Sequence, residues 1–179
     1  MLKTNDMLPK RKQIRLRNHD YSGGLYFITA CTHNKIHFFG EIKHCKMFTS
    51  SIGKKLNSVL NRFNNPDSEF TVWSYCVMPN HFHALIEINN SEPQNENLVC
   101  PTTRGDKRTR LSVFVGEIKA IITKYARNNG YLDFKWQSKY NDHIVRDIHE
   151  CNLITEYIEN NQYRWDKDTL YSPIGLIHR

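Results

Sequence analysis

The sequence predicts an α+β fold in which an antiparallel sheet carries two helices on one face. Three observations predict this class: short runs rich in β-branched and aromatic residues, longer segments with helical spacing, and an order in which the two kinds alternate. The chain has 179 residues, which is the usual length of one domain. We therefore expect a single domain over residues 1–179.

The first half of the chain contains three expected strands and one expected helix. Leu25–Thr32 is short, apolar and bounded by glycines and an asparagine, which is typical of a buried strand. Residues 49–63 place apolar side chains at steps of three and four behind a Thr-Ser-Ser run, which predicts an amphipathic helix. The strand-like runs 70–78 and 81–88 are separated only by a Pro-Asn pair, which indicates a hairpin.

The second half begins with a long polar loop at residues 91–110, whose end is basic. Residues 111–127 carry one apolar helical face, a short strand is expected at 143–145, and residues 148–162 return to helical spacing. The order β-α-β-β-α-β, followed by an additional C-terminal helix, is the ferredoxin-like arrangement. That fold hosts many functions, so the function has to be argued from a site.

Charge and composition exclude several classes of protein. Lys and Arg number 25 against 18 Asp and Glu, a net charge of +7 that favours an anionic partner such as nucleic acid. No segment approaches the roughly eighteen consecutive apolar residues of a membrane span, and the first twenty residues lack a signal-peptide core. The five cysteines form no CxxC pair, so we expect free thiols and a cytoplasmic protein without a membrane partner.

The first candidate site is the triplet His81-Phe82-His83 on the third expected strand. Side chains two residues apart on a strand share a face, so both imidazoles project from one side of the sheet. Two neutral imidazoles side by side form half of a site for a divalent cation. Nine histidines in this chain produce such a triplet by chance about 0.4 times, so two ordinary hydrogen-bonded histidines are the competing interpretation.

The second candidate site pairs Tyr157 with Asn161, four residues apart on the last expected helix. A phenol is protonated at neutral pH and needs a strongly polarised electrophile to act as a nucleophile. A cation held by His81 and His83 could polarise a phosphate in this way, and the Asn161 carbonyl could complete the set of protein ligands. A core tyrosine whose hydroxyl reaches solvent is the competing interpretation.

Three blocks of sequence follow one another in the chain: VMPNHFH at 77–83, WQSKYNDHIVR at 136–146 and EYIENN at 156–161. The first resembles the metal-binding motif of the HUH single-tyrosine transposases, and the other two resemble the C-terminal block of the REP-associated subgroup. The resemblance extends from about residue 25 to residue 161. It implies a ferredoxin-like enzyme that cleaves single-stranded DNA near a hairpin, forms a covalent 5′-phosphotyrosine and releases a 3′-hydroxyl.

By this resemblance Tyr157 is the nucleophile, and His81, His83 and Asn161 are the metal ligands. The metal is expected to be Mg²⁺ or Mn²⁺, because phosphoryl chemistry and an oxygen ligand suit the harder ions. The chain departs from the subgroup at Gln162, where a proline is usual, so the resemblance does not fix the residue at which the helix ends. The loop at 91–110 is also longer than a minimal member needs, so its contacts cannot be carried over.

We expect DNA contacts from two basic segments and from the C-terminal block. Lys and Arg would bind phosphates, and aromatic rings would stack on splayed bases. A solvated surface is the competing interpretation for each basic run, and a place in the core is the competing one for each tryptophan. The candidates are Lys10, Arg11, Lys12, Arg15 and Arg17 in an N-terminal arm, Arg104, Lys107, Arg108 and Arg110 at the loop end, and Trp136 and Arg146.

The leading hypothesis is a metal-dependent endonuclease and strand transferase for single-stranded and hairpin DNA. It would act as a monomer or a homodimer, with the tyrosine beside the histidines of its own subunit or of its partner. The alternative is a hairpin-binding protein that does not cleave. A third hypothesis, an RNA binder that uses the sheet face, lacks an RNP-like aromatic motif.

Overall fold

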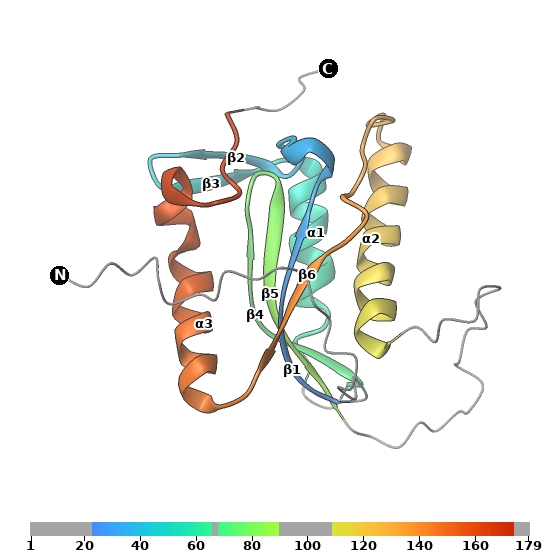
Figure 1. Cartoon of the computed structure of the whole chain (residues 1–179). Helices are drawn as coiled ribbons and strands as arrows, with labels where there is room; N and C mark the ends of the chain where they lie inside the picture. Colours follow the sequence, from blue (N-terminus) through green and yellow to red (C-terminus); the bar gives the residue numbers. More distant parts are fainter. Residues whose placement is uncertain (1–22, 66–67, 90–108, 174–179) are drawn as a thin grey trace, which may run out of the picture.

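The computed structural model describes residues 23–65, 68–89 and 109–173. Within these ranges it confirms the α+β class, with four strands in one antiparallel sheet and α-helices against both of its faces (Figure 1). The strands are β1 (Gly24–Cys31), β4 (Phe70–Val77), β5 (His81–Ile88) and β6 (Asn141–Val145), and the helices are α1 (Ser51–Asn61), α2 (Arg110–Asn128) and α3 (Ile148–Asn160). The expected N-terminal arm and most of the loop at 91–110 lie outside the described residues.

The sheet has the strand order β4-β5-β1-β6, and each neighbouring pair is antiparallel. β1 and β5 therefore occupy its centre, as the ferredoxin-like arrangement requires. In the register between them, Thr29 lies opposite His83 and Cys31 lies opposite His81. The histidine pair thus lies on a central strand, flanked on both sides by other strands.

The two faces of β5 meet different layers. Phe82, Ala84 and Ile86 belong to the main core, which also contains the buried residues of α1 and α2. The alternate residues point to the opposite face, which α3 covers (Figure 1). The apolar core under α3 is the smaller one and consists of Cys76, Met78, Leu85, Val145, Ile154, Ile158 and Trp165.

Each of these three helices begins at a residue whose side chain accepts a backbone hydrogen bond. Ser50 caps α1, Thr109 caps α2, and Asp147 caps α3 through a 2.8 Å bond from the Glu150 amide. α3 ends at Asn160 and continues into the 3₁₀ helix η4 (Asn161–Lys167). The helix expected at 148–162 therefore ends two residues early, and Asn161 lies at the junction.

A second, two-stranded sheet was not predicted. It is a hairpin of β2 (Gly40–Lys43) and β3 (Lys46–Thr49), which follows the short 3₁₀ turn η2 (His33–Lys35). Gln162, at the position where the transposase subgroup usually has proline, binds this hairpin, because its Oε1 accepts a hydrogen bond from the Met47 amide at 3.1 Å. The hairpin is thereby joined to η4 and to the end of α3.

The sequence predicted that no segment spans a membrane and that the cysteines are free thiols. In the described ranges, no helix is both long enough and apolar enough to cross a membrane. The cysteines there carry free thiols, as expected, and Cys100 lies outside these ranges.

Candidate active site

Two histidines of β5 lie at the centre of the sheet, on the face that α3 covers. His81 and His83 are both buried, and their Nε2 atoms are 3.0 Å apart. The rings meet at an interplanar angle of 72°, with centroids 4.6 Å apart. Each imidazole therefore directs its Nε2 atom toward the same point between the two rings.

Hydrogen bonds fix which nitrogen each ring turns toward the other. His81 Nδ1 lies 2.7 Å from Oδ1 of Asn80, and because an amide oxygen only accepts, Nδ1 donates the proton. Asn80 is itself oriented, since its Nδ2 donates to two backbone carbonyl oxygens at 3.2 and 3.0 Å. Thr29 Oγ1 lies 2.7 Å from His83 Nδ1 and, because a hydroxyl can accept, allows His83 the same tautomer with the proton on Nδ1. Both Nε2 atoms then present lone pairs.

The burial of the pair keeps both rings neutral. Burial lowers the pKa of His83 to about 3, and burial together with the neighbouring ring lowers the pKa of His81 well below its usual range. With both protons on Nδ1, the two Nε2 lone pairs face each other at 3.0 Å and repel, and a cation between them would turn this repulsion into two bonds. The geometry and the neutrality of the pair fit a divalent metal ion.

Asp168 adds a carboxylate to the pair, and sequence reasoning missed it. Its Oδ2 lies 3.6 Å from His81 Nε2 and has no hydrogen-bond partner among the described residues. The candidate ligand atoms of His81, His83 and Asp168 all lie within 4.8 Å of one another. Burial raises the pKa of this carboxyl, which a nearby cation would counteract. Two imidazoles and one carboxylate form a donor set that suits several divalent metals.

Tyr157 reaches the same place from α3. Its hydroxyl oxygen lies 3.4 Å from His83 Nε2, so the tyrosine stands beside the histidines of its own chain. Its ring packs edge-on against Phe27, with centroids 6.0 Å apart. Burial, and after it the charge of Asp168, raises the pKa of Tyr157 to about 12, while a hydrogen bond with Asn161 lowers it. The hydroxyl is therefore protonated at neutral pH.

Asn161 lies next to Tyr157, as the four-residue spacing predicts. Its side chain is buried and hydrogen-bonds to the tyrosine hydroxyl. Its Oδ1 has no hydrogen-bond partner within the part of the chain that the structure describes. Asn161 and Asp168 are thus both candidate oxygen ligands for a metal at the histidine pair.

Few of the expected DNA-binding residues can be placed. Arg110 forms an ion pair with Glu69 at 2.9 Å, at the start of α2. Arg146 is exposed at the start of the segment that leads into α3, and its backbone amide donates to Glu150. The others, Lys10, Arg11, Lys12, Arg15, Arg17, Arg104, Lys107 and Arg108, lie outside the described residues.

Trp136 is half-buried and packs against the main core, on the face of the sheet opposite the histidine pair. Its ring contacts the rings of Phe39, Phe82 and Phe134 at centroid distances of 5.3, 6.0 and 5.5 Å. Its Nε1 donates to the Lys119 carbonyl at 3.1 Å, so its one polar atom is also paired inside the protein.

The comparison with protein sequences gives one informative relative. No family model matches the chain. A Haemophilus influenzae protein, described as an uncharacterized protein, is 33% identical over 175 residues, which cover 94% of this chain and 97% of that protein. The chain belongs to the same family as this Haemophilus protein.

A solved structure matches the fold over nearly the whole length of the chain. The structure of a REP-associated tyrosine transposase bound to a REP hairpin matches with a TM-score of 0.52 at 15% sequence identity, over 93% of this chain and 92% of that chain. The chain has the fold of the REP-associated tyrosine transposases. In this tyrosine-transposase fold the histidine pair lies on a central strand of the sheet, and the C-terminal helix carries Tyr157 over it.

Proposed function

We propose that the chain is a transposase: a metal-dependent endonuclease and strand transferase that acts on single-stranded DNA at hairpins through a covalent 5′-phosphotyrosine. The observation that carries this proposal is the distance of 3.4 Å between the Tyr157 hydroxyl and Nε2 of His83, within a pair of neutral imidazoles. The transposase of similar fold is bound to a REP hairpin, which supports hairpin DNA as the substrate class.

The residues at the site fit a divalent cation. His81 and His83 would hold it through their Nε2 atoms, and Asp168, Asn161 or both would add an oxygen ligand. Oxygen donors together with phosphoryl chemistry favour Mg²⁺ or Mn²⁺. When bound, such an ion polarises the phosphate and stabilises the charge of the transition state.

Tyr157 acts as the nucleophile in this proposal. Its oxygen attacks phosphorus and loses its proton, the bond from phosphorus to O3′ breaks, and O3′ leaves as a hydroxyl after taking up a proton. One phosphodiester replaces another, so a DNA 3′-hydroxyl can reverse the step and join a new strand. Because the pKa of Tyr157 is about 12, the hydrogen bond from Asn161, which lowers that pKa, assists the loss of the phenol proton.

Hairpin binding without cleavage is the second candidate function. The same raised pKa of Tyr157 favours it, because a protonated phenol is a weak nucleophile. The RNA-binding hypothesis is less favoured, since α1 and α2 cover one face of the described sheet and α3 covers the β4–β5 part of the other face (Figure 1).

A cleavage assay separates the two candidates. A hairpin oligonucleotide with a single-stranded 5′ extension, labelled at its 3′ end so that the label stays on the 3′ side of the cleavage region, is incubated with the protein and Mn²⁺, and SDS-resistant adducts are resolved on a gel. Tyr157→Phe should abolish the adduct and leave hairpin binding in place. Tyr163→Phe is the matched control, because that tyrosine is 66% exposed on η4, and it should form the adduct like the parent.

Two outcomes would contradict the nuclease proposal. One is an adduct that persists in Tyr157→Phe or in EDTA, since it would come from another nucleophile or need no metal. The other is the absence of any adduct from parent protein that binds the hairpin, which would leave the binding function alone.

A further inference from the structure

The helices on the two faces of the sheet differ in charge. α1 and α2 together carry six basic side chains and a single acidic one, Glu117. α3, on the other face (Figure 1), carries three glutamates and neither Lys nor Arg. Positive potential attracts the phosphate backbone of nucleic acids. The stronger attraction among the helices therefore comes from the face opposite Tyr157.

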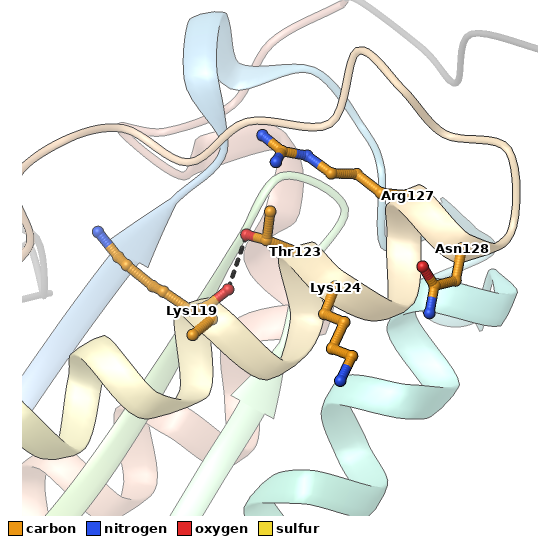
Figure 2. Close-up of a pocket in the computed structure, with 6 residues that line it drawn as sticks. Lys119, Thr123, Lys124, Arg127 and Asn128 are labelled. Carbon is orange, nitrogen blue, oxygen red and sulfur yellow. Dashed lines mark hydrogen bonds between the residues drawn. The ribbon is translucent and has the colours of Figure 1, made fainter.

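Three of these six basic residues, Lys119, Lys124 and Arg127, lie on the C-terminal half of α2, where their side chains extend from the helix (Figure 2). Ala120, Lys124 and Arg127 follow one another at steps of four and three, so they share one side of the helix. A shallow depression of about 490 Å³ opens there. It is lined by Lys119, Ala120, Thr123, Lys124, Arg127 and Asn128.

α1 extends this surface. Lys55 places its Nζ 5.8 Å from the centroid of the Tyr125 ring, next to Lys124 in the sequence of α2. Lys55, Lys119, Lys124 and Arg127 are termed the α2 basic surface from here on.

One member of the α2 basic surface, Lys119, is held by its neighbours, and two others, Lys124 and Arg127, are available to a ligand. Lys119 donates from Nζ to the Gln137 carbonyl at 2.8 Å, and its Nζ lies 5.7 Å from the Trp136 ring. In contrast, Lys124 and Arg127 are exposed and form no ion pair with any residue of the described ranges. Their charges are thus not neutralised by described neighbours and can meet a ligand's phosphates.

The kind of side chain exposed on each face indicates the form of the nucleic acid. Single strands are bound by aromatic rings that stack on unpaired bases, and duplexes largely by cations on phosphates. In the described residues, neither α1 nor α2 exposes a large aromatic side chain, whereas Tyr163 and Tyr171 are exposed in and after η4. The α1–α2 face therefore suits a duplex, in which the bases are already stacked on one another.

We infer that the α2 basic surface binds the phosphate backbone of a double-stranded DNA stem, on the face opposite the one where Tyr157 meets single-stranded DNA. From Lys119 to Arg127 the helix rises about 12 Å. Along that length a duplex carries about seven phosphate charges, more than enough to engage the two available cations, Lys124 and Arg127. The inference rests on the proposed function for the choice of DNA as the nucleic acid.

The test measures DNA binding by the full chain in EDTA, so that cleavage does not contribute. The probe is a labelled blunt DNA duplex, and affinity is read from fluorescence anisotropy over a range of salt concentrations. The double variant Lys124→Gln with Arg127→Gln should bind the duplex about tenfold more weakly, with a salt slope smaller by about 1.8, because each lost phosphate contact removes roughly 0.9. Its thermal unfolding should match the parent, since both side chains are exposed.

The control variant, Lys43→Gln with Lys46→Gln, removes the same number of charges from the β2–β3 hairpin and should keep duplex affinity within about twofold. Equal losses of duplex affinity in the two double variants, or no loss in the α2 variant, would show that the α2 basic surface is not the duplex-binding site. If the α2 variant lost as much affinity for a single strand as for the duplex, or if the parent bound an RNA duplex more tightly than the DNA duplex, a DNA stem would not be the ligand of this surface. The result does not depend on the adduct assay, so failure of the nuclease proposal is seen separately.

Discussion

Asn80 connects His81 to the segment that follows η4. Its Oδ1 accepts from His81 Nδ1 at 2.7 Å, while its Nδ2 donates to the Leu170 carbonyl at 3.0 Å. The Leu170 amide in turn donates to Oδ1 of Asp168 at 2.6 Å, and the other oxygen of Asp168 faces His81. These bonds close a ring that orients an imidazole and a carboxylate toward the same point.

Asn80→Ala should weaken Mn²⁺ binding by about 10 to 100-fold, because the bond that fixes the tautomer of a ligating histidine contributes to metal affinity. Calorimetric titration of the folded protein with Mn²⁺ measures the change. Asn152→Ala, an exposed position on α3, is the control and should bind Mn²⁺ like the parent. An unchanged affinity in Asn80→Ala would show that the ring of bonds does not set the metal site.

Asp168→Asn should lower Mn²⁺ affinity by about tenfold or more, since it removes the charge of a proposed ligand and keeps its size and its hydrogen-bonding oxygen. Asp166→Asn, two residues earlier and exposed, tests for a general effect of charge. If the two variants bind Mn²⁺ equally well, Asp168 is not a ligand. The same titration of Asn161→Ala would then assign the oxygen ligand.

The metal-free protein should lose stability as the pH falls below about 6.5. In the folded chain the pKa of His83 is lowered to about 3, whereas the unfolded imidazole takes up a proton near its ordinary value of 6.5. Between these values the unfolded state binds more protons, so the free energy of unfolding rises with pH. The raised pKa of Asp168 acts in the opposite direction and offsets part of the effect at the acid end.

Urea unfolding in EDTA should show the free energy of unfolding smaller by about 1 to 3 kcal/mol at pH 5.5 than at pH 7.5. His83→Gln should reduce this pH dependence. The control His149→Gln removes an exposed histidine of α3 and should retain it. A parent protein with equal stability at both pH values would contradict a neutral buried pair.

Glu150 anchors the first turn of α3 to β6. Its loss should disturb the position of Tyr157, because Tyr157 lies on the same helix. One of its carboxylate oxygens is hydrogen-bonded to His143 Nε2, and the other accepts from the Arg146 amide at 2.9 Å. Glu150→Ala leaves these groups unpaired and should lower the free energy of unfolding by about 1 to 3 kcal/mol. Adduct formation should slow as well, while Mn²⁺ affinity stays unchanged, because Glu150 is outside the candidate metal cluster of His81, His83 and Asp168.

The exposed Glu156→Ala, on the same helix, serves as the control for loss of charge. Should Glu150→Ala weaken Mn²⁺ binding as strongly as it slows the adduct, the variant would be disturbing the whole site. The anchoring role would then be rejected.

The sequence predicted the main sheet and the three long helices because their signals are local. Alternating strands and amphipathic helices show their period within a few residues, and the Pro-Asn pair marked the turn between β4 and β5. His81, His83 and Tyr157 were found for a similar reason, since each lies in a short motif. The β2–β3 hairpin has no such signal, because its turn places His44 and Cys45 at φ values of 49° and 58°, where glycine or asparagine is usual.

Asp168 could not be found from the sequence for a different reason. It follows a 3₁₀ helix in a segment without periodicity, and its position depends on contacts with Leu170 and with the histidine pair on β5. Only the folded chain brings it to His81. The α2 basic surface was also missed, because Lys55 and Lys124 come from helices that are far apart in the chain and adjacent in space.

The unequal size of the two cores has a consequence for motion. α3 is held to the sheet by the smaller apolar cluster, so separating it from the sheet exposes less apolar surface than separating α1 or α2 would. Its amide hydrogens should accordingly exchange with deuterium before those of the other two helices. Tyr157, the proposed nucleophile, thus lies on the helix whose separation from the sheet costs least, so the proposed function would let a DNA strand enter or leave while the rest of the sheet stays folded.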